Sequence, residues 1–427
     1  MKLTEADQFK VIIVGGSMAG LFAAILLIRN GFKVDVFERS TAGLDGRGAG
    51  IVTHPELFAV LGRAGIAIEP AALGTAVSSR RVLDRAGRII NEIELPQVLT
   101  SWGRLYAVLK AMLPPDTIHS GATLDRVEHT ADRVIAVFQD GRRASGDLLV
   151  GADGLFSAVR RQFLPDVRPL YAGYVAWRGL VEEASLTDVT RAAICDHFAF
   201  CLPPGEQMLG YPVTGAGEDT TPGRRRFNFV WYRPAVPDEL RKLLTDTSGK
   251  LHELSIPPNV IRSEVMATMR DDAERLLAPP FAEVVRNTRE PFIQAILDLD
   301  VPTMVPNARV ALIGDAAFVA RPHVGAGVTK AAADADCLAH ALAASGGRLD
   351  EALAGFDRSR RTLNAAIVTR ARELGAYMQA QVLSDRERQL AELHRKPGAV
   401  IAETAVPVHP ARPDLSAGRS PAFEAGA

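Results

Sequence analysis

The segment Val11-Ile-Ile-Val-Gly-Gly-Ser-Met-Ala-Gly20 is the clearest indication of fold in this chain of 427 residues. Its four apolar residues predict a strand buried on both faces, and the glycines after them predict a sharp turn into a helix. Apolar residues then recur at helical spacing until Gly31, a residue suited to ending a helix. Residues 33–38 alternate between polar and apolar side chains and end in an acid, which predicts a second strand. The segment therefore opens a strand–helix–strand unit.

The spacing inside this unit favours a dinucleotide phosphate site. The fingerprint Gly-x-Gly-x-x-Gly is met except that Ser17 replaces the middle glycine, and serine is small enough for close backbone approach. Glu38 lies 23 residues after Gly15, where an acid would bind a ribose hydroxyl. A merely structural turn is the alternative, which the flanking strand, helix and acid disfavour. The residues assigned to this site are Gly15, Ser17, Met18, Ala19, Gly20, Glu38 and Arg39.

A second strand-and-glycine segment, Val310-Ala-Leu-Ile-Gly-Asp-Ala-Ala317, follows almost 300 residues later. Asp315 can accept hydrogen bonds from polyol hydroxyls. The loop Gly325-Ala326-Gly327 leads into a helix whose N-terminus favours an anion. These could be ordinary loop residues, but their joint spacing indicates a long, bent cofactor held at both ends.

A third segment, 148–160, places Asp153 in a turn between a strand and a helix. Taken alone, it is better explained as an Asp-Gly turn that caps the helix.

The remaining pattern indicates a second domain. Residues 171–181 and 226–233 are aromatic, alternating strands, typical of an antiparallel sheet. Residues 134–139 and 147–150 predict a hairpin. A proline-free stretch from 349 to 393 predicts a long helix, and the Pro-, Ala- and Gly-rich residues 396–427 predict a flexible tail.

The composition excludes several classes of protein. The net charge is -1 and the pI near 6.8, so no strong field attracts nucleic acid or an anionic membrane. None of the three cysteines forms a Cys-x-x-Cys pair, so no metal site is expected. No apolar run approaches the roughly 20 residues needed to span a bilayer, and the N-terminus lacks a signal-peptide pattern. We expect a cytoplasmic enzyme.

Taken in order, the three segments resemble the FAD-dependent aromatic hydroxylases, the single-component flavoprotein monooxygenases of the para-hydroxybenzoate hydroxylase type. The resemblance covers about residues 10–60, 100–165 and 305–345. The segments 171–179 and 317–327 are most similar to the 2,6-dihydroxypyridine 3-hydroxylase branch. Two departures are Ser17 in the fingerprint and Phe318, where many relatives have histidine after Gly-Asp-Ala-Ala.

The resemblance implies an α/β fold: a Rossmann-like FAD-binding domain with an inserted antiparallel-sheet substrate domain and a long C-terminal helix. It assigns residues 1–75, 100–168 and 300–395 to the FAD-binding domain, 76–99 and 169–299 to the substrate domain, and 396–427 to the tail. It further implies that Arg47, Arg104 and Asp153 contact FAD, beside the residues already named. A homodimer is also expected from the family.

The implied reaction is hydroxylation of an electron-rich aromatic or hydroxypyridine ring by O2. NAD(P)H reduces the FAD, and a flavin C4a-hydroperoxide transfers its distal oxygen to the ring. No second nucleotide-binding fold is visible, so the sequence does not indicate whether NADH or NADPH is the reductant.

Ring activation needs a group that can take a proton near neutral pH. His323, in the glycine loop, is the first candidate for this group and His54 is the second. For each of them, the alternative is a structural or surface histidine without a catalytic role. The candidate substrate residues are Tyr174, Arg178, Tyr211 and Pro322. Aromatic strand residues are more often core, and Arg178 could equally be a solvated strand residue.

Three other functions fit part of the pattern. Another FAD oxidoreductase, such as a halogenase or a saturating reductase, would share the fold, although the WxWxIP segment of halogenases is absent. An NAD-dependent dehydrogenase would leave Asp315 and Gly325–Gly327 unexplained. A non-catalytic flavin-binding redox sensor could use the long helix and tail for docking.

Overall fold

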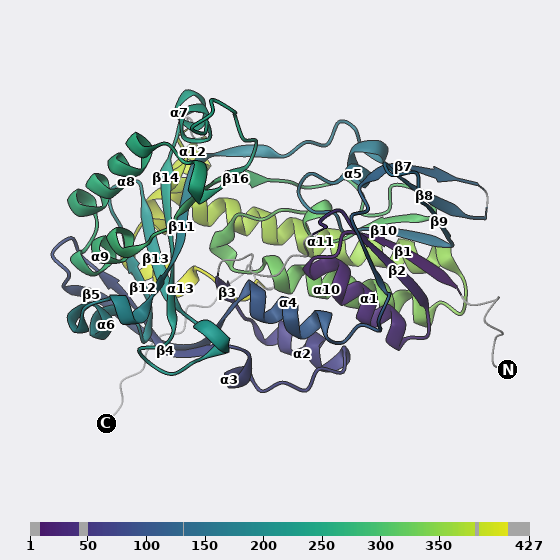
Figure 1. Ribbon diagram of the computed structural model, residues 1–427, viewed down its shortest axis with the longest axis horizontal. Coiled ribbons are helices and arrows are strands. Elements are labelled where there is room, and N and C mark those ends of the chain that lie inside the picture. The colour runs from purple at the N-terminus through teal and green to yellow at the C-terminus, as the bar shows by residue number, and fades with distance from the viewer. Residues whose placement is uncertain (1–8, 42–49, 131, 381–383, 409–427) are drawn as a thin grey trace, which may run out of the picture.

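The computed structural model describes residues 9–41, 50–130, 132–380 and 384–408. Figure 1 shows a parallel sheet at one end, a larger sheet at the other, and the long helix α11 (Leu349–Gly375) running between them. This arrangement confirms the fold expected from the sequence, a Rossmann-like part joined to a largely antiparallel one.

The first sheet has five parallel strands in the order β17-β10-β1-β2-β6. The β1 strand lies at its centre, where both faces are covered, which explains why its residues are continuously apolar. Helix α1 (Met18–Arg29) crosses from β1 to β2. The strands are β1 (Lys10–Val14), β2 (Lys33–Glu38), β6 (Ile118–Ser120), β10 (Leu148–Gly151) and β17 (Val310–Leu312).

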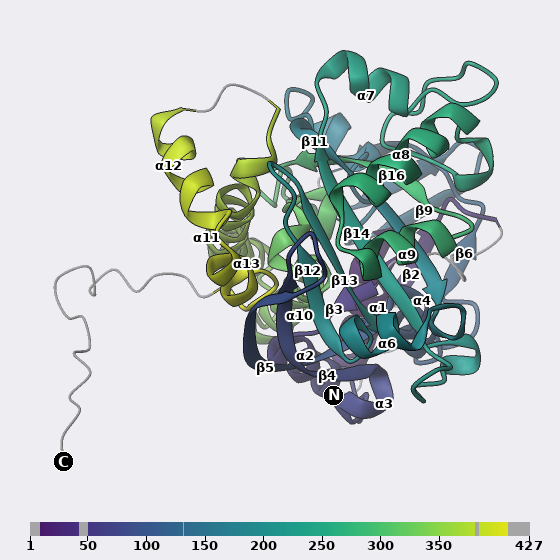
Figure 2. The same ribbon diagram turned by 90° about the vertical axis from the view of Figure 1, so that its left-hand side faces the viewer.

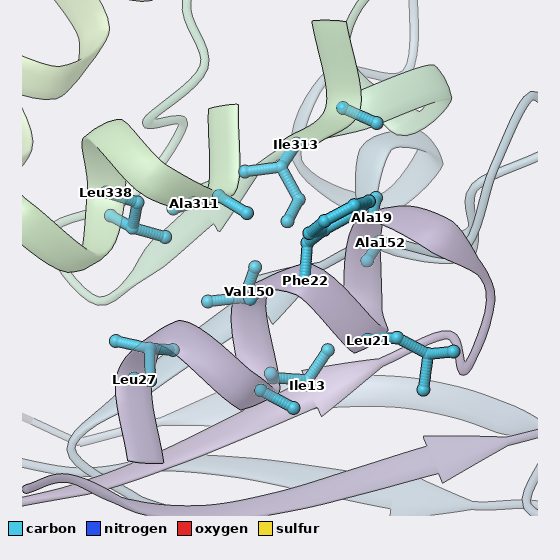
Figure 3. Close-up of a cluster of buried hydrophobic side chains, with 14 of the residues drawn as sticks. Ile13, Ala19, Leu21, Phe22, Leu27, Val150, Ala152, Ala311, Ile313 and Leu338 are labelled. Carbon is cyan, nitrogen blue, oxygen red and sulfur yellow. The ribbon is translucent and has the colours of Figure 1, made fainter. Parts of the chain in front are cut away.

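The core of this part joins segments that are far apart in the sequence. Figure 3 shows Ile13 and Phe22 of the first unit packed with Val150, Ala311 and Leu338. All five side chains are 0% exposed. Burying a side chain the size of isoleucine or phenylalanine contributes about 2 kcal/mol. This packing therefore fixes the two glycine segments on one sheet.

The predicted hairpin of 134–139 with 147–150 is wrong in its second strand. β8 (Val134–Phe138) turns at Asp140-Gly141 into β9 (Arg143–Gly146), and β8 also pairs with β7 (Leu124–His129). β10 instead pairs in parallel with β1. The four residues of β10 are buried on both faces, a pattern that belongs to a parallel sheet rather than to an exposed hairpin.

The second large sheet has nine strands, β15-β16-β11-β14-β13-β12-β4-β5-β3. Every neighbouring pair is antiparallel except β12 with β4. Helices α8 (Ser263–Leu276) and α9 (Pro279–Asn287) cover its outer face (Figure 1). Its strands are β3 (Gly50–Val52), β4 (Thr75–Leu83), β5 (Ile89–Ser101), β11 (Leu170–Glu182), β12 (His197–Cys201), β13 (Gln207–Val213), β14 (Arg226–Pro234), β15 (Ser255–Ile256) and β16 (Phe292–Asp298).

The other helices fill the spaces around the sheets. They are α2 (Pro55–Arg63), α3 (Pro70–Leu73), α4 (Trp102–Lys110), α5 (Ala158–Phe163), α6 (Asp188–Ile194), α7 (Pro237–Leu243), α10 (Gly327–Ala344), α12 (Asp385–His394) and α13 (Pro397–Glu403). Short 3₁₀ turns at Gly314–Ala316 and Pro322–Val324 follow β17.

The C-terminal region differs from the expectation in two ways. The predicted helix over 349–393 is broken, because α11 ends at Gly375 and α12 begins only at Asp385. The predicted flexible tail begins with an ordered helix, α13, whose Val400 and Ile401 are buried. Figure 2 shows α13 beside β5 of the large sheet. Apolar burial explains the order here, which the Pro- and Ala-rich composition concealed.

Candidate active site

A cavity of about 600 Å³ opens at the carboxyl ends of β1, β2 and β10. Ligands in open α/β sheets bind at this edge. Its lining includes five residues predicted for the cofactor: Gly15, Ser17, Glu38, Arg39 and Asp153.

The glycine turn has no room for side chains. Gly15 has φ +109°, and a Cβ there would lie 2.3 Å from the carbonyl oxygen of Ala152. A Cβ on Gly20 would lie 1.9 Å from the carbonyl oxygen of Gly15, so Gly20 lets α1 pack against the turn. The Ser17 side chain makes no capping hydrogen bond to α1. The turn thus presents the N-terminus of α1 and a hydroxyl to the cavity, as a pyrophosphate requires.

Met18 and Ala19 are buried in the first turn of α1 and lie outside the lining of the cavity. Only their backbone N–H groups, at the N-terminus of the helix, can serve an anion.

Glu38 connects the end of β2 to the glycine turn. One carboxylate oxygen accepts the N–H of Gly16 at 2.8 Å, and the other accepts the N–H of Ser40 at 2.8 Å. These bonds fix the carboxylate at the cavity wall. Each oxygen retains a lone pair for a hydroxyl donor.

Asp153 caps a helix with one carboxylate oxygen, while the other has no hydrogen-bond partner in the described part of the chain. Its Oδ2 accepts the N–H groups of Ala158 and Val159, which is a helix cap. Its Oδ1 is buried without a hydrogen-bond partner among the described residues. Burial raises the pKa of this carboxyl. An orphaned acceptor at the cavity wall is suited to a ligand donor.

A second cavity, of about 390 Å³, lies between the two large sheets. Trp102, Leu254 and Gln294 line both cavities, so the two adjoin. Asp315, Pro322, Gly325, Ala326 and Gly327 form one side of the second cavity. Gly325 has φ +60° at the end of the 3₁₀ turn, which aims the start of α10 at the cavity.

Asp315 is 55% exposed at the cavity, above the fully buried Lys330 of α10. The Lys330 Nζ lies 3.8 Å from Asp315 Oδ1 and 4.0 Å from Asp334 Oδ2. Desolvation raises the pKa of Asp315; Lys330 opposes this rise and Asp334 adds to it. The carboxylate is well placed for hydroxyl groups of a ligand.

The opposite wall comes from the large sheet. Arg178 and Tyr211 line it, as predicted, together with Tyr232 and Phe198. Arg178 donates from Nη1 to Gln294 Oε1 at 2.9 Å, while its Nε is buried without a hydrogen-bond partner among the described residues. Burial raises the pKa of Tyr211 to about 12, so this phenol stays protonated.

His323 and Tyr174 lie behind this wall rather than on it. They are 1% and 0% exposed, and His323 Nε2 lies 2.8 Å from the Tyr174 hydroxyl. Tyr232 separates them from the cavity, with its ring 4.4 Å from that of His323. Burial lowers the pKa of His323 to about 3, so its ring is neutral at ordinary pH.

His54 is also outside the cavity lining. It is 2% exposed and precedes α2, and burial lowers its pKa. The structure thus brings neither histidine into position to take a proton directly from a ring in the cavity. Both positions follow from tertiary packing, which the loop assignment of each histidine did not reveal.

Of Arg47 and Arg104, both predicted to contact FAD, Arg104 alone lies within the described residues. Arg104 donates to the carbonyl of Ala72 at 3.2 Å and lines neither cavity. Trp102, at the start of the same helix, lines both instead. Arg47 lies outside the described residues.

Several lining residues were missed by sequence reasoning. Arg161 borders the first cavity, and the second has Phe292, Gln294, Thr404 and Ala405 on its wall. None belongs to a motif. The alternation of β16 could have signalled Gln294, but residues 404–405 lie in the segment predicted as tail.

Within the described ranges, histidine, cysteine and acidic side chains form no group of three that could hold a metal ion. None of the described helices combines the length and apolarity needed to cross a bilayer.

Comparison with known proteins agrees with this geometry. The family described as FAD binding domain matches residues 8–210, and a second, FAD binding domain-like, matches 171–298. The chain is 34% identical to the 2,6-dihydroxypyridine 3-monooxygenase of Paenarthrobacter nicotinovorans over 332 residues, 77% of this chain and 82% of that protein. It is 31% identical to the 3-amino-4-hydroxybenzoate 2-monooxygenase of Streptomyces cremeus over 86% and 87% of the two chains.

Solved structures extend the similarity to the fold. The 2,6-dihydroxypyridine-3-hydroxylase from Arthrobacter nicotinovorans superposes with a TM-score of 0.82 at 30% identity, covering 88% of this chain and 95% of that one. A point variant of Klebsiella pneumoniae HpxO, in complex with FAD, gives a TM-score of 0.73 at 25% identity, covering 93% and 95%.

A glycine turn, two adjoining cavities and these relatives define a flavoprotein oxidoreductase. The chain belongs to the FAD binding domain family of FAD-dependent aromatic-ring monooxygenases, as its resemblance to the aromatic hydroxylases implied. FAD is its cofactor.

Proposed function

We propose that the chain hydroxylates a small, electron-rich aromatic or heteroaromatic ring that binds as an anion in the cavity between the two large sheets, which we name the ring cavity. The observation that carries this proposal is Arg178, a cation on the cavity wall whose buried Nε has no hydrogen-bond partner within the described ranges. Among the described residues no carboxylate pairs with it in an ion pair. An arginine without a counter-ion is suited to a carboxylate or to an ionised ring hydroxyl.

The cofactor would span the adjoining cavities. Ser17 and the α1 N-terminus would hold the pyrophosphate, Glu38 and Asp153 would accept from the adenosine side, and Asp315 from the ribityl chain. The backbone N–H groups that open α10 at Gly327 would face the isoalloxazine pyrimidine edge. Two observations support the fit. Asp153 Oδ1 has no hydrogen-bond partner in the part of the chain that the structure describes, and no side chain at Gly15 hinders an approach to the backbone.

Bound FAD, after reduction by NAD(P)H, supplies the activated oxygen. The balanced reaction consumes ring C–H, O2, NAD(P)H and a proton, and yields ring C–OH, NAD(P)+ and water. Arg178 lowers the cost of holding the ring oxygen as an anion, which donates electrons to the attacked carbon. Tyr211, kept protonated by burial, can donate a hydrogen bond to the same ring.

In this proposal Arg178 activates the ring by its charge, whereas the sequence predicted a proton acceptor, His323 or His54. A cation can hold an acidic ring hydroxyl in its ionised form without itself accepting a proton. The apolar side chains of Phe198, Leu209, Val230 and Ile296 on the same wall lower the local polarity, which would strengthen that charge interaction.

The domain division stays part of the proposal: residues 1–75, 100–168 and 300–395 for FAD, and 76–99 and 169–299 for the ring. We also propose a cytoplasmic homodimer without membrane or nucleic-acid partners. Size and light scattering of the purified protein test its oligomeric state.

The test of function is a panel of hydroxypyridines, hydroxybenzoates and neutral phenyl ethers, each with NADH and with NADPH. We expect a subset of the acidic rings to stimulate NAD(P)H oxidation and O2 uptake, and to gain one oxygen by mass. The neutral ethers serve as matched controls. A flavin-loaded protein whose NAD(P)H oxidation responds to no ring would instead favour the redox-sensor alternative.

A further inference from the structure

Residues 401–405, which we name the C-terminal strap, form part of the wall of the ring cavity. Thr404 and Ala405 line that cavity together with Tyr211 and Gly325. The strap begins in the last turn of α13, whose buried Val400 and Ile401 share an apolar cluster with Val52, Phe198 and Tyr211. The last described segment of the chain thus closes a site whose other walls come from much earlier residues.

The strap is held to the large sheet by Arg80 of β4. This arginine is 0% exposed. Its Nη1 donates to the carbonyls of Ile401 at 2.8 Å and of Thr404 at 2.5 Å, and its Nη2 donates to Ala405 at 3.2 Å. One guanidinium therefore satisfies three carbonyl groups at the C-terminal end of α13.

Gln97 of β5 completes this anchor. Its Oε1 accepts from Arg80 Nη2 at 2.5 Å, and its Nε2 donates to the carbonyl of Ala405 at 3.0 Å. The Arg80 cation also lies 5.0 Å from the ring centroid of Phe198, which itself lines the cavity. Among the described residues, all hydrogen-bond acceptors of Arg80 are neutral. Burying a cation without a carboxylate costs free energy, so we infer that Arg80 does more here than fill space in the core.

The other side of the strap meets the loop before α10. The N–H of Ala405 donates to the carbonyl of His323 at 2.6 Å. A Cβ on Gly325 would lie 2.8 Å from that of Ala405, and Ala405 itself has φ +53°. A non-glycine residue in this region is uncommon and is held there by its surroundings. The strap therefore bridges the sheet wall and the glycine loop across the cavity.

We propose that Arg80 is a positioning residue that holds Thr404 and Ala405 as a wall of the ring cavity, and that this wall sets which rings the enzyme admits. The inference deepens the proposed function and rests on it for its substrate readouts. Arg80 acts through the strap, since it does not line the cavity itself.

The first test concerns the anchor alone and needs no substrate. Hydrogen exchange of residues 397–408 is compared in the FAD-loaded parent, Arg80→Met and Arg80→Lys. Loss of bonds from a buried charged donor should speed exchange at Ala405 by about tenfold or more in Arg80→Met, and less in Arg80→Lys. Arg81→Met is the matched control, because Arg81 is the next residue of β4 but pairs with Glu92 at 2.9 Å.

The second test concerns the wall. KM and kcat are measured with 2,6-dihydroxypyridine and 3-amino-4-hydroxybenzoate in the parent, Arg80→Met, Gln97→Met and Ala405→Gly. We expect the ratio of the two KM values to change at least about threefold, and the share of NAD(P)H oxidation that ends as hydrogen peroxide to rise, with FAD content unchanged. Iodide quenching of bound FAD should increase in Arg80→Met, whether or not either compound is hydroxylated.

The outcomes separate the two proposals. If hydrogen exchange at Ala405 is unchanged in Arg80→Met, the proposal that Arg80 anchors the strap is wrong. If exchange is faster but iodide quenching, the KM ratio and the share of peroxide are all unchanged, the proposal that the strap is a selective wall of the ring cavity is wrong. If the parent hydroxylates neither compound, the proposed function is not supported for these rings, while exchange and iodide quenching still decide the position of the strap.

Discussion

The phenol oxygen of Tyr174 and Nε2 of His323 lie 2.8 Å apart, and the two side chains are almost completely enclosed. Tyr174 comes from β11 and His323 from the loop before α10, so their contact joins the two parts of the molecule. A neutral imidazole suits this place, because burial and the nearby Arg321 guanidinium both disfavour a charged ring.

The buried imidazole should make stability depend on pH. The pKa of His323 is about 3, below the ordinary 6.5, so the unfolded chain binds one more proton between these values. The contribution of this group is fully present above pH 6.5 and is lost, at about 1.4 kcal/mol per pH unit, as the pH falls. We expect His323→Gln to flatten the dependence of the unfolding free energy between about pH 6.5 and pH 5. Urea unfolding followed by circular dichroism measures it.

Tyr174→Phe is the control for this pH effect. It removes the hydrogen bond but keeps the imidazole, so it should lower stability by about 1 kcal/mol at every pH and leave the slope unchanged. Equal slopes in His323→Gln and the parent would contradict the assignment of acid sensitivity to this histidine.

The parts of the fold that follow from local sequence were predictable. The β1–α1–β2 unit needs a continuous apolar strand, a glycine turn and a terminal acid, and all three lie within residues 10–38. Asp315 and Gly325–Gly327 were found for the same reason. Thr404, Ala405 and Arg80 were not, because their roles depend on α13 docking against β4 and β5. No local pattern encodes that contact; the alternation of β5 indicates a strand but not the helix that packs on it.

Gly20→Ala tests the close approach of α1 to the glycine turn. Its Cβ would lie 1.9 Å from the Gly15 carbonyl oxygen, which is backbone and cannot move alone. We expect a loss of about 1–3 kcal/mol in unfolding free energy, and FAD affinity at least about tenfold weaker. Urea unfolding and titration of the apoprotein with FAD measure the two effects.

Gly355→Ala is the matched helical control for Gly20. Nothing lies within 4 Å of the added Cβ at this position in α11. Stability should rise by about 0.5–1 kcal/mol, with FAD affinity unchanged. If both variants behaved alike, the tight packing at Gly20 would be refuted.

Arg178→Met tests recognition of an anionic ring. Loss of a hydrogen bond to a charged partner should raise KM for an acidic ring about tenfold or more, with FAD binding retained. Arg178→Lys should restore part of the affinity, since lysine keeps the charge but not the planar fork. Steady-state kinetics on the best substrate of the panel provides the measurement. Arg226→Met, on the neighbouring β14 and outside both cavities, is the control. If KM were unchanged in Arg178→Met, the proposal that Arg178 binds the ring as an anion would be wrong.

Asp315→Ala should weaken FAD binding far more than His323→Ala does. Asp315 lines the ring cavity with a side chain that is 55% exposed, so its carboxylate oxygens are free to accept hydrogen bonds from ligand hydroxyls. Removing the carboxylate should cost about tenfold or more in affinity, measured by titrating apoprotein with FAD and following flavin fluorescence.

Asp336→Ala, which removes the ion pair that this α10 residue makes with Arg63, is the control and should bind FAD as the parent does. His323→Ala should retain most of its flavin, because this side chain lies behind Tyr232 and lines neither cavity. An Asp315→Ala protein that keeps full flavin occupancy would show that the second glycine segment does not hold the cofactor.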